Sequence, residues 1–103
     1  MSREPLDQSR KLVTELPGPK ARQLREHLET YVPKAVSPST PAFVSRAEGG
    51  IVEDVDGNRL IDLGSGIAVT TVGASHPKVV KAVQDQVADF THTCFMVTPY
   101  DSY

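Results

Sequence analysis

The chain has 103 residues and a formal net charge of −2, from 11 basic and 13 acidic residues. That length allows one small domain, and the absence of Trp leaves few of the large side chains that fill protein cores. The basic residues form no cluster interleaved with aromatics, which excludes the surface of a typical nucleic-acid-binding protein.

Membrane and secretory classes are also disfavoured by the pattern of apolar residues. No run approaches the roughly 20 apolar residues of a membrane-spanning helix. Residues 1–5 lead into polar sequence without the apolar core of a signal peptide. The single cysteine, Cys94, rules out an internal disulfide and fits a reducing compartment. We therefore expect a cytoplasmic chain with no membrane partner.

The first part of the chain, residues 1–40, is predicted to be a polar segment with one helix. Residues 16–19, Leu-Pro-Gly-Pro, stop any regular element. A helix is predicted after them, because apolar residues recur there at helical spacing. It ends before Pro33, since a proline disfavours helical conformation in the residue before it. These residues are Ala21, Leu24, Leu28 and Tyr31. Residues 37–41, Ser-Pro-Ser-Thr-Pro, then indicate an extended linker.

The second part, residues 41–103, is predicted to be a lobe that begins with a small antiparallel sheet. Residues 51–55 and 59–63 are β-prone runs, and residues 56–58, Asp-Gly-Asn, supply the positive φ of a tight turn. Phe43 and Val44 add a third short strand. The apolar residues are concentrated in this part and few in number, so we expect little stability from the chain alone.

A helix over about residues 77–90 follows the segment Gly-Ser-Gly-Ile-Ala-Val at 64–69. Pro77 suits a first helical turn, where its missing N–H has no cost. Apolar residues at spacings of three and four, from Val79 to Phe90, form one face of the helix. The tail, residues 91–103, ends where another helix would begin.

Glycines at 64 and 66 suggest a phosphate-binding loop, but the motif is incomplete. No further glycine follows at the required spacing, and no Gly-Lys-Ser/Thr is present. The alternative is that the glycines let the backbone turn sharply and approach something closely. The spacing does not decide whether that neighbour is core or ligand.

The histidines and the cysteine also have structural interpretations. Three histidines and one cysteine are too few and too scattered to predict a zinc site, and we expect no metal. Cys94 is predicted to be a buried structural residue, His76 a capping or packing residue, and His27 a solvated helix position. Cysteine catalysis with His92 would need a suitably placed base and an oxyanion hole.

Four acidic residues cluster around the predicted hairpin. They are Glu53, Asp54, Asp56 and Asp62. Paired carboxylates perform acid–base chemistry or bind cations, but alternation along a hairpin favours a solvated face, with Asp56 in the turn. The residues alone therefore predict no complete active site and no catalytic residue.

Several ordered motifs resemble the start of the class III (subgroup II) pyridoxal-phosphate aminotransferases. They are the Asp-x-Asp-Gly hairpin at 54–62, the Gly-Ile-Ala-Val segment at 66–69, and the His-Pro helix from residue 76. The run Thr-His-Thr-Cys-Phe at 91–95 is similar to that of the bacterial 4-aminobutyrate aminotransferase branch. The resemblance covers roughly residues 16–103.

The resemblance implies an α/β parent of fold type I, a homodimer with active sites at the subunit boundary. This chain would be its α+β amino-terminal segment, with a small antiparallel hairpin and a following helix. The implied reaction moves the amino group of 4-aminobutyrate, or a similar ω-amino acid, to 2-oxoglutarate. In this reading Gly66 and Ile67 border the substrate, with Ile67 as an apolar wall, and Met96 faces the same region.

The sequence differs from the family pattern at two places, and these differences limit which family features can be assigned to this chain. Some bacterial relatives carry Gln at the position of Met96, so no hydrogen-bonding role comes to Met96. Relatives often have Gly-His-x-His-Pro where residues 73–77 read Gly-Ala-Ser-His-Pro. Neighbouring branches act on ornithine, acetylornithine or other ω-amines and share the hairpin and the His-Pro helix.

Transamination needs a lysine that binds pyridoxal 5'-phosphate covalently and an acid beside the pyridine nitrogen. In the family these residues lie beyond position 103, and Lys78 and Lys81 match no family lysine. We therefore expect the chain to be inactive alone, with no residue of its own that binds the cofactor. A truncated product, a stand-alone interaction module and a non-functional gene remnant remain open readings.

Overall fold

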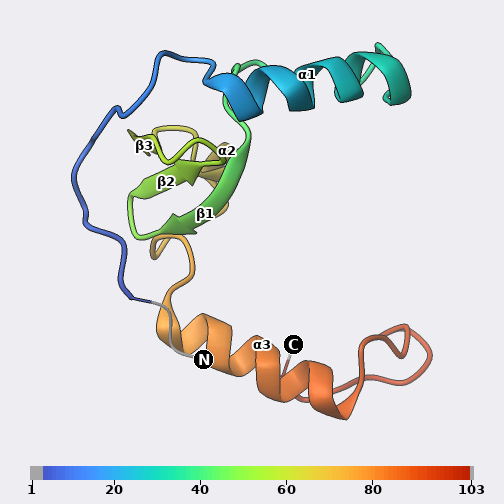
Figure 1. Cartoon of the computed structure of the whole chain (residues 1–103). Helices are drawn as coiled ribbons and strands as arrows, with labels where there is room; N and C mark the ends of the chain where they lie inside the picture. The colour runs from blue at the N-terminus through green and yellow to red at the C-terminus, as the bar shows by residue number, and fades with distance from the viewer. Residues whose placement is uncertain (1–3, 103) are drawn as a thin grey trace.

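The computed structural model describes residues 4–102 as a small sheet with a helix on either side (Figure 1). In chain order the elements are α1 Pro19–Tyr31, β1 Val44–Glu48, β2 Ile51–Asp54, β3 Arg59–Ile61, α2 Ser65–Ala68 and α3 Pro77–Asp89. Residues 4–18 form an extended arm that runs past the sheet, from the side of α3 to the side of α1.

The sheet is antiparallel in the order β1-β2-β3, which confirms the predicted three strands. Its register pairs Glu48 with Ile51 across the first turn and Glu53 with Arg59 across the second. β1 extends the short strand expected at 43–44, whereas β3 ends before the predicted limit of residue 63. An isolated bridge between Lys11 and Arg59 places the arm beside β3.

The centre of the hairpin is polar, which the sequence did not predict. Asn58 and Asp54 are 0% and 2% exposed, so the expected solvated face is wrong for Asp54. Asp54 Oδ1 accepts the N–H groups of Asp56 and Asn58 at 2.9 and 2.8 Å, and Asp54 Oδ2 accepts Asn58 Nδ2 at 2.9 Å. Asn58 Oδ1 accepts the N–H groups of Val13 and Thr14 at 2.8 and 2.9 Å. This network ties the arm to the second turn of the sheet.

The start of α1 is held by the same turn. Helix N-termini leave unsatisfied N–H groups that a carboxylate stabilises. Asp56 supplies it, accepting the N–H groups of Lys20 and Ala21 at 2.9 Å each. A Cβ at Gly18 would lie 2.4 Å from Asp56 Cγ, so only glycine allows this approach. The helix ends at Tyr31, before Pro33, as predicted.

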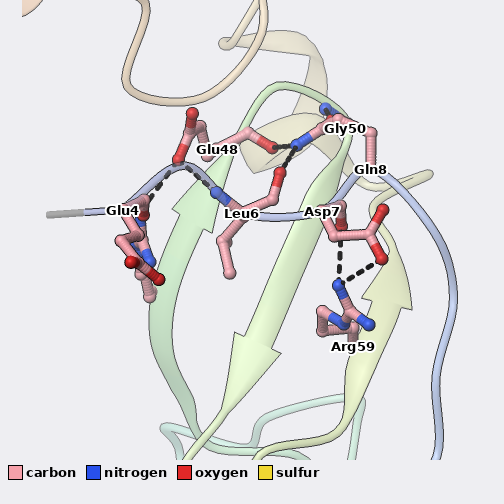
Figure 2. A network of polar contacts seen from close by, with 8 residues as sticks. Glu4, Leu6, Asp7, Gln8, Glu48, Gly50 and Arg59 are labelled. Carbon is pink, nitrogen blue, oxygen red and sulfur yellow. Dashed lines mark hydrogen bonds and ion pairs between the residues drawn. The ribbon is translucent and has the colours of Figure 1, made fainter.

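The beginning of the arm is bonded to the other end of the sheet, as Figure 2 shows. Leu6 is 7% exposed and donates its N–H to Glu48 Oε2 at 2.9 Å. The Gln8 amide donates to Glu48 O at 3.0 Å and accepts the N–H of Gly50 at 3.1 Å. Asp7 forms an ion pair with Arg59, Oδ2 to Nη1, at 2.9 Å. The arm has no regular structure, yet polar contacts fix its path.

Helix α3 starts at Pro77 and has few contacts with the rest of the chain. His76 caps it, because His76 Nδ1 accepts the N–H of Lys78 at 3.3 Å, which confirms the predicted capping role. Its apolar face is open: Val83 and Val87 are 59% and 55% exposed. Within residues 4–102, extensive contacts between elements occur only inside the sheet.

After α3 the chain makes a loop and returns along the helix (Figure 1). Ser102 donates to Gln86 Oε1 at 2.7 Å, and Tyr100 packs edge-on against Phe90 and Phe95 at 5.4 and 5.2 Å between ring centroids. A groove of about 600 Å³ opens along this face of α3. The helix start expected at 99–103 is a turn at 101–102, and residue 103 lies outside the described residues.

The dimensions indicate a chain that buries little of its own surface. The radius of gyration is 17.0 Å, against about 13 Å for a compact domain of this length. The accessible surface is 8315 Å², against about 5,700 Å² for a compact protein of this mass. Both differences follow from α1 and α3 standing away from the sheet.

Candidate substrate-facing segment

The segment after β3 contains a left-handed turn. Element α2, Ser65–Ala68, has four successive positive φ angles of 48°, 61°, 62° and 63°. Ile67 N–H donates to Gly64 O at 2.8 Å, and Val69 N–H donates to Ser65 O at 2.7 Å. Left-handed helix costs each non-glycine L-residue on the order of 1–2 kcal/mol. Three such residues make this the most strained backbone segment among residues 4–102.

Ile67 combines that strain with exposure. It is β-branched, has φ 62° and ψ 60°, and leaves its side chain 94% exposed. A β-branched residue in this region is a conformational outlier, and an exposed apolar side chain contributes nothing to offset the cost. Such strain concentrates at ligand-contacting segments, where the surrounding structure holds it in place. The geometry therefore marks residues 65–68 as a candidate site.

Asp62 and a pair of hydroxyl groups hold the turn at its two ends. Asp62 Oδ1 accepts the N–H groups of Gly64 and Ser65 at 3.0 and 2.8 Å. At the other end, Ser65 Oγ and Thr70 Oγ1 are 2.6 Å apart. Alternation along the hairpin favoured a solvated face for Asp62, but its side chain is half-buried and bonded to the backbone.

Both ends of the loop that carries the turn meet at the Gly49–Gly50 turn. Asp62 donates its N–H to Gly50 O at 2.9 Å, and Gly49 and Ala74 exchange two backbone bonds of 2.9 Å. A Cβ on Gly73 would approach Gly49 Cα to 3.1 Å, so this meeting requires a glycine. The sheet and the arm thus set the position of residues 62–74.

Met96 lies in a separate part of the chain. It belongs to a turn that starts at Cys94, where Val97 N–H donates to Cys94 O at 2.8 Å, and its side chain is 93% exposed. In Figure 1 the segment after α3 lies at the end of that helix remote from the sheet and α2. The structure of this chain therefore does not bring Met96 together with Gly66 and Ile67.

Within residues 4–102, the remaining chemistry-bearing residues form no second site. All five lysines are exposed, and Lys81 pairs with Asp85 on the surface of α3 at 2.6 Å. Cys94 is a free, half-buried thiol and not the fully buried residue expected. In the part of the chain that the structure describes, no three His, Cys, Asp or Glu residues are grouped to hold a metal ion. Among residues 4–102, no helix is long and apolar enough to cross a membrane.

The sequence has extensive similarity to known aminotransferases. Residues 31–103 match the family described as aminotransferase class-III. The 4-aminobutyrate aminotransferase of Mycobacterium leprae (strain TN) is 63% identical over 98 residues, and that of Mycobacterium tuberculosis (strain ATCC 25618 / H37Rv) is 65% identical over the same length. Each alignment covers 95% of this chain and 22% of the relative. The 5-aminovalerate aminotransferase DavT of Pseudomonas putida is 49% identical over 72 residues, covering 70% of this chain and 17% of DavT.

Solved structures of similar fold come from the same group of enzymes. Acetylornithine aminotransferase from Elizabethkingia anophelis has a TM-score of 0.66 at 30% identity, covering 71% of this chain and 18% of its own. Ornithine δ-aminotransferase of Plasmodium falciparum has a TM-score of 0.66 at 23% identity, covering 71% of this chain and 19% of its own. The small sheet and its flanking segments are therefore an arrangement also found within much longer chains.

Proposed function

The chain belongs to the class III aminotransferases, and we propose that it forms the amino-terminal segment of an enzyme that transfers the amino group of 4-aminobutyrate to 2-oxoglutarate. The observation that supports this substrate is the identity of 63–65% with 4-aminobutyrate aminotransferases over 95% of the chain. Identity with the 5-aminovalerate aminotransferase DavT is lower, at 49% over 72 residues.

In this proposal the left-handed turn forms one wall of the substrate pocket. Gly66 lets the backbone bend, and Ile67 presents an apolar side chain that is 94% exposed in this chain. The methylene chain of an ω-amino acid is the part of the substrate that such a wall would contact, and burial of each methylene is worth about 0.8 kcal/mol. The exposure and the backbone strain of Ile67 both support this role.

Met96 is proposed to face the same pocket from a second direction. Its exposed thioether is suited to an apolar wall, since methionine adapts to irregular surfaces. Because it lies apart from Ile67 here, the proposal requires the rest of the enzyme to bring the two walls together. The open apolar face of α3 supports that requirement, since packing against the remaining subunit or a partner in a homodimer would bury it.

The cofactor of the family, pyridoxal phosphate, does not fit the residues of this chain. Covalent attachment requires a lysine in an enclosed site whose surroundings tune its pKa. All five lysines are exposed, so none of them has such an enclosed site in this chain. The residues that hold the cofactor are therefore proposed to lie in the part of the enzyme that corresponds to the portion of each relative outside the 22% that aligns with this chain.

The test is a chimera in which this chain replaces the corresponding segment of Mycobacterium tuberculosis 4-aminobutyrate aminotransferase. We expect the chimera to convert 4-aminobutyrate and 2-oxoglutarate at a rate comparable with the parent, because the segments are 65% identical over 98 residues. The chain alone is expected to be inactive and to retain no covalent label after borohydride treatment with the cofactor. A folded chimera that is inactive on every ω-amino acid would contradict the proposal.

A further inference from the structure

We propose that Asp62 is a positioning residue that fixes where Ile67 stands and thereby sets the length of ω-amino acid that is accepted. This inference rests on the proposed function. Asp62 does not itself face the substrate; it bonds to the backbone at the start of the left-handed turn. Its Oδ1 atom accepts two successive N–H groups, of Gly64 at 3.0 Å and Ser65 at 2.8 Å.

The carboxylate is itself held firmly by the sheet. Asp62 directly follows β3, where Ile61 pairs with Ile51, a core residue that is 4% exposed. The N–H of Asp62 donates to Gly50 O at 2.9 Å, so the backbone that leads into Asp62 is held to the sheet. Any displacement of the carboxylate relative to the sheet would therefore strain an existing contact.

Beyond its own backbone hydrogen bonds, the turn has little other support from side chains. The Ile67 side chain is 94% exposed and cannot hold its own backbone by packing. The only other side-chain bond at this turn, within the residues described, joins Ser65 Oγ and Thr70 Oγ1 at 2.6 Å. Without Asp62 two N–H groups lose their acceptor, and the left-handed conformation is no longer held at its N-terminal end. Ile67 would then sample other positions, and the distance from this wall to the opposite side of the substrate pocket would no longer be fixed.

The experiment uses the active chimera of this chain with the Mycobacterium tuberculosis enzyme, carrying Asp62→Ala or Asp62→Asn. The matched control is Glu53→Ala, which removes a carboxylate from the same sheet that accepts no hydrogen bond from the turn. Steady-state kinetics with 4-aminobutyrate and 5-aminovalerate give KM, kcat and the preference between the two lengths. Amide hydrogen exchange at Ser65 reports on the turn without reference to activity.

Asp62→Ala is expected to raise the KM for 4-aminobutyrate roughly tenfold and leave kcat within about twofold, since ground-state and transition-state contacts of the wall weaken together. The preference for 4-aminobutyrate over 5-aminovalerate should fall, and exchange at Ser65 should accelerate. Asp62→Asn should retain the native values, because an amide oxygen accepts the same two N–H groups. Glu53→Ala should also retain them.

Two further variants are informative, and the first of them, Thr70→Val, tests the positioning role even if Asp62→Ala fails to fold. Thr70→Val removes the bond at the other end of the turn with little change in shape, and it should shift the length preference in the same direction. Asp62→Ala combined with Ile67→Ala should be no less selective than Ile67→Ala alone, because Asp62 acts through Ile67.

The outcomes separate this inference from the proposed function. If the unsubstituted chimera prefers 4-aminobutyrate but its length preference is unchanged in Asp62→Ala and Thr70→Val, the positioning role is wrong and the proposed function stands. If the loss in Asp62→Ala falls on kcat alone, or if Asp62→Asn is as impaired as Asp62→Ala, the role is also wrong. If the unsubstituted, folded chimera is inactive, both proposals fail.

Discussion

Two regions of the molecule differ in which side chains they bury. One region is the arm together with the sheet, and the other is helix α3 together with the tail. In the first region the most buried side chains are polar, Asn58 and Asp54, and hydrogen bonds link segments distant in sequence. In the second region the apolar face of α3 stands open, with Val83 59% exposed. The buried polar groups of the first region are hydrogen-bonded within the chain. The apolar face in the second region would have to pack against another segment or chain to be buried.

This difference has an energetic consequence for the isolated chain. A helix of 13 residues is marginal in water unless tertiary packing stabilises its apolar face. The buried polar network, by contrast, makes the second hairpin turn and the arm mutually dependent, since each would leave unsatisfied groups without the other. The stability of the chain alone should therefore reside in the arm and the sheet.

The largest expected effect comes from Asn58→Ala. It removes the donor to Asp54 Oδ2 and the acceptor of two arm N–H groups, leaving a buried carboxylate underpaired. We expect a loss of roughly 3–5 kcal/mol in the unfolding free energy of the sheet region. Urea denaturation, together with amide exchange in β2, measures it.

Gln84→Ala on α3 is the matched control, because it removes an exposed amide from the other region. Its effect should stay within about 0.5 kcal/mol. Comparable losses for the two amides would mean that α3, and not the polar network, limits stability, and the contrast between the regions would be lost.

A smaller effect is expected for Gly18→Ala, which tests the junction between the sheet and α1. The new Cβ would lie 2.4 Å from Asp56 Cγ and displace the carboxylate from the N–H groups of Lys20 and Ala21. We expect a loss of about 1–2 kcal/mol, from the broken cap and the steric strain.

Gly50→Ala is the control for that variant, since a Cβ at Gly50 meets no atom within 4 Å. Thermal unfolding followed by circular dichroism compares the two glycines directly. Equal losses would show that the close approach of Asp56 is not what requires glycine at position 18.

The sequence predicted the elements because their signals are local. Apolar spacing and Pro77 located α3, and residues 56–58 located the second turn of the sheet. The capping role of His76 was likewise visible from the following proline. Each of these features depends on residues within a few positions of one another.

The polar network and the turn at the candidate site depended on contacts across the chain. Asn58 accepts hydrogen bonds from Val13 and Thr14, which lie 45 and 44 positions earlier in the sequence. No local pattern distinguishes such an asparagine from a solvated one. The glycines at 64 and 66 indicated a sharp turn, but the positive φ of Ile67 requires the anchors at Asp62 and Gly50. The role of Met96 stays a prediction, because it depends on neighbours outside this chain.

The smallest expected effect concerns the ion pair that fixes the arm to β3. Hydrogen bonds from Ser9 and Arg59 lower the pKa of Asp7 from its ordinary value of 3.8. A carboxyl group whose pKa is lower in the folded state stabilises the fold above its unfolded pKa, and that contribution is lost as the pH falls through the folded value. Asp7→Asn should therefore be less stable than the native chain at neutral pH, with the difference shrinking as the pH falls below 3.8 and vanishing below the lowered pKa of the folded state. Carboxyl-carbon chemical shifts measure the pKa directly; Ser9→Ala should raise it, and an unchanged pKa in that variant would show that Ser9 does not hold the pair.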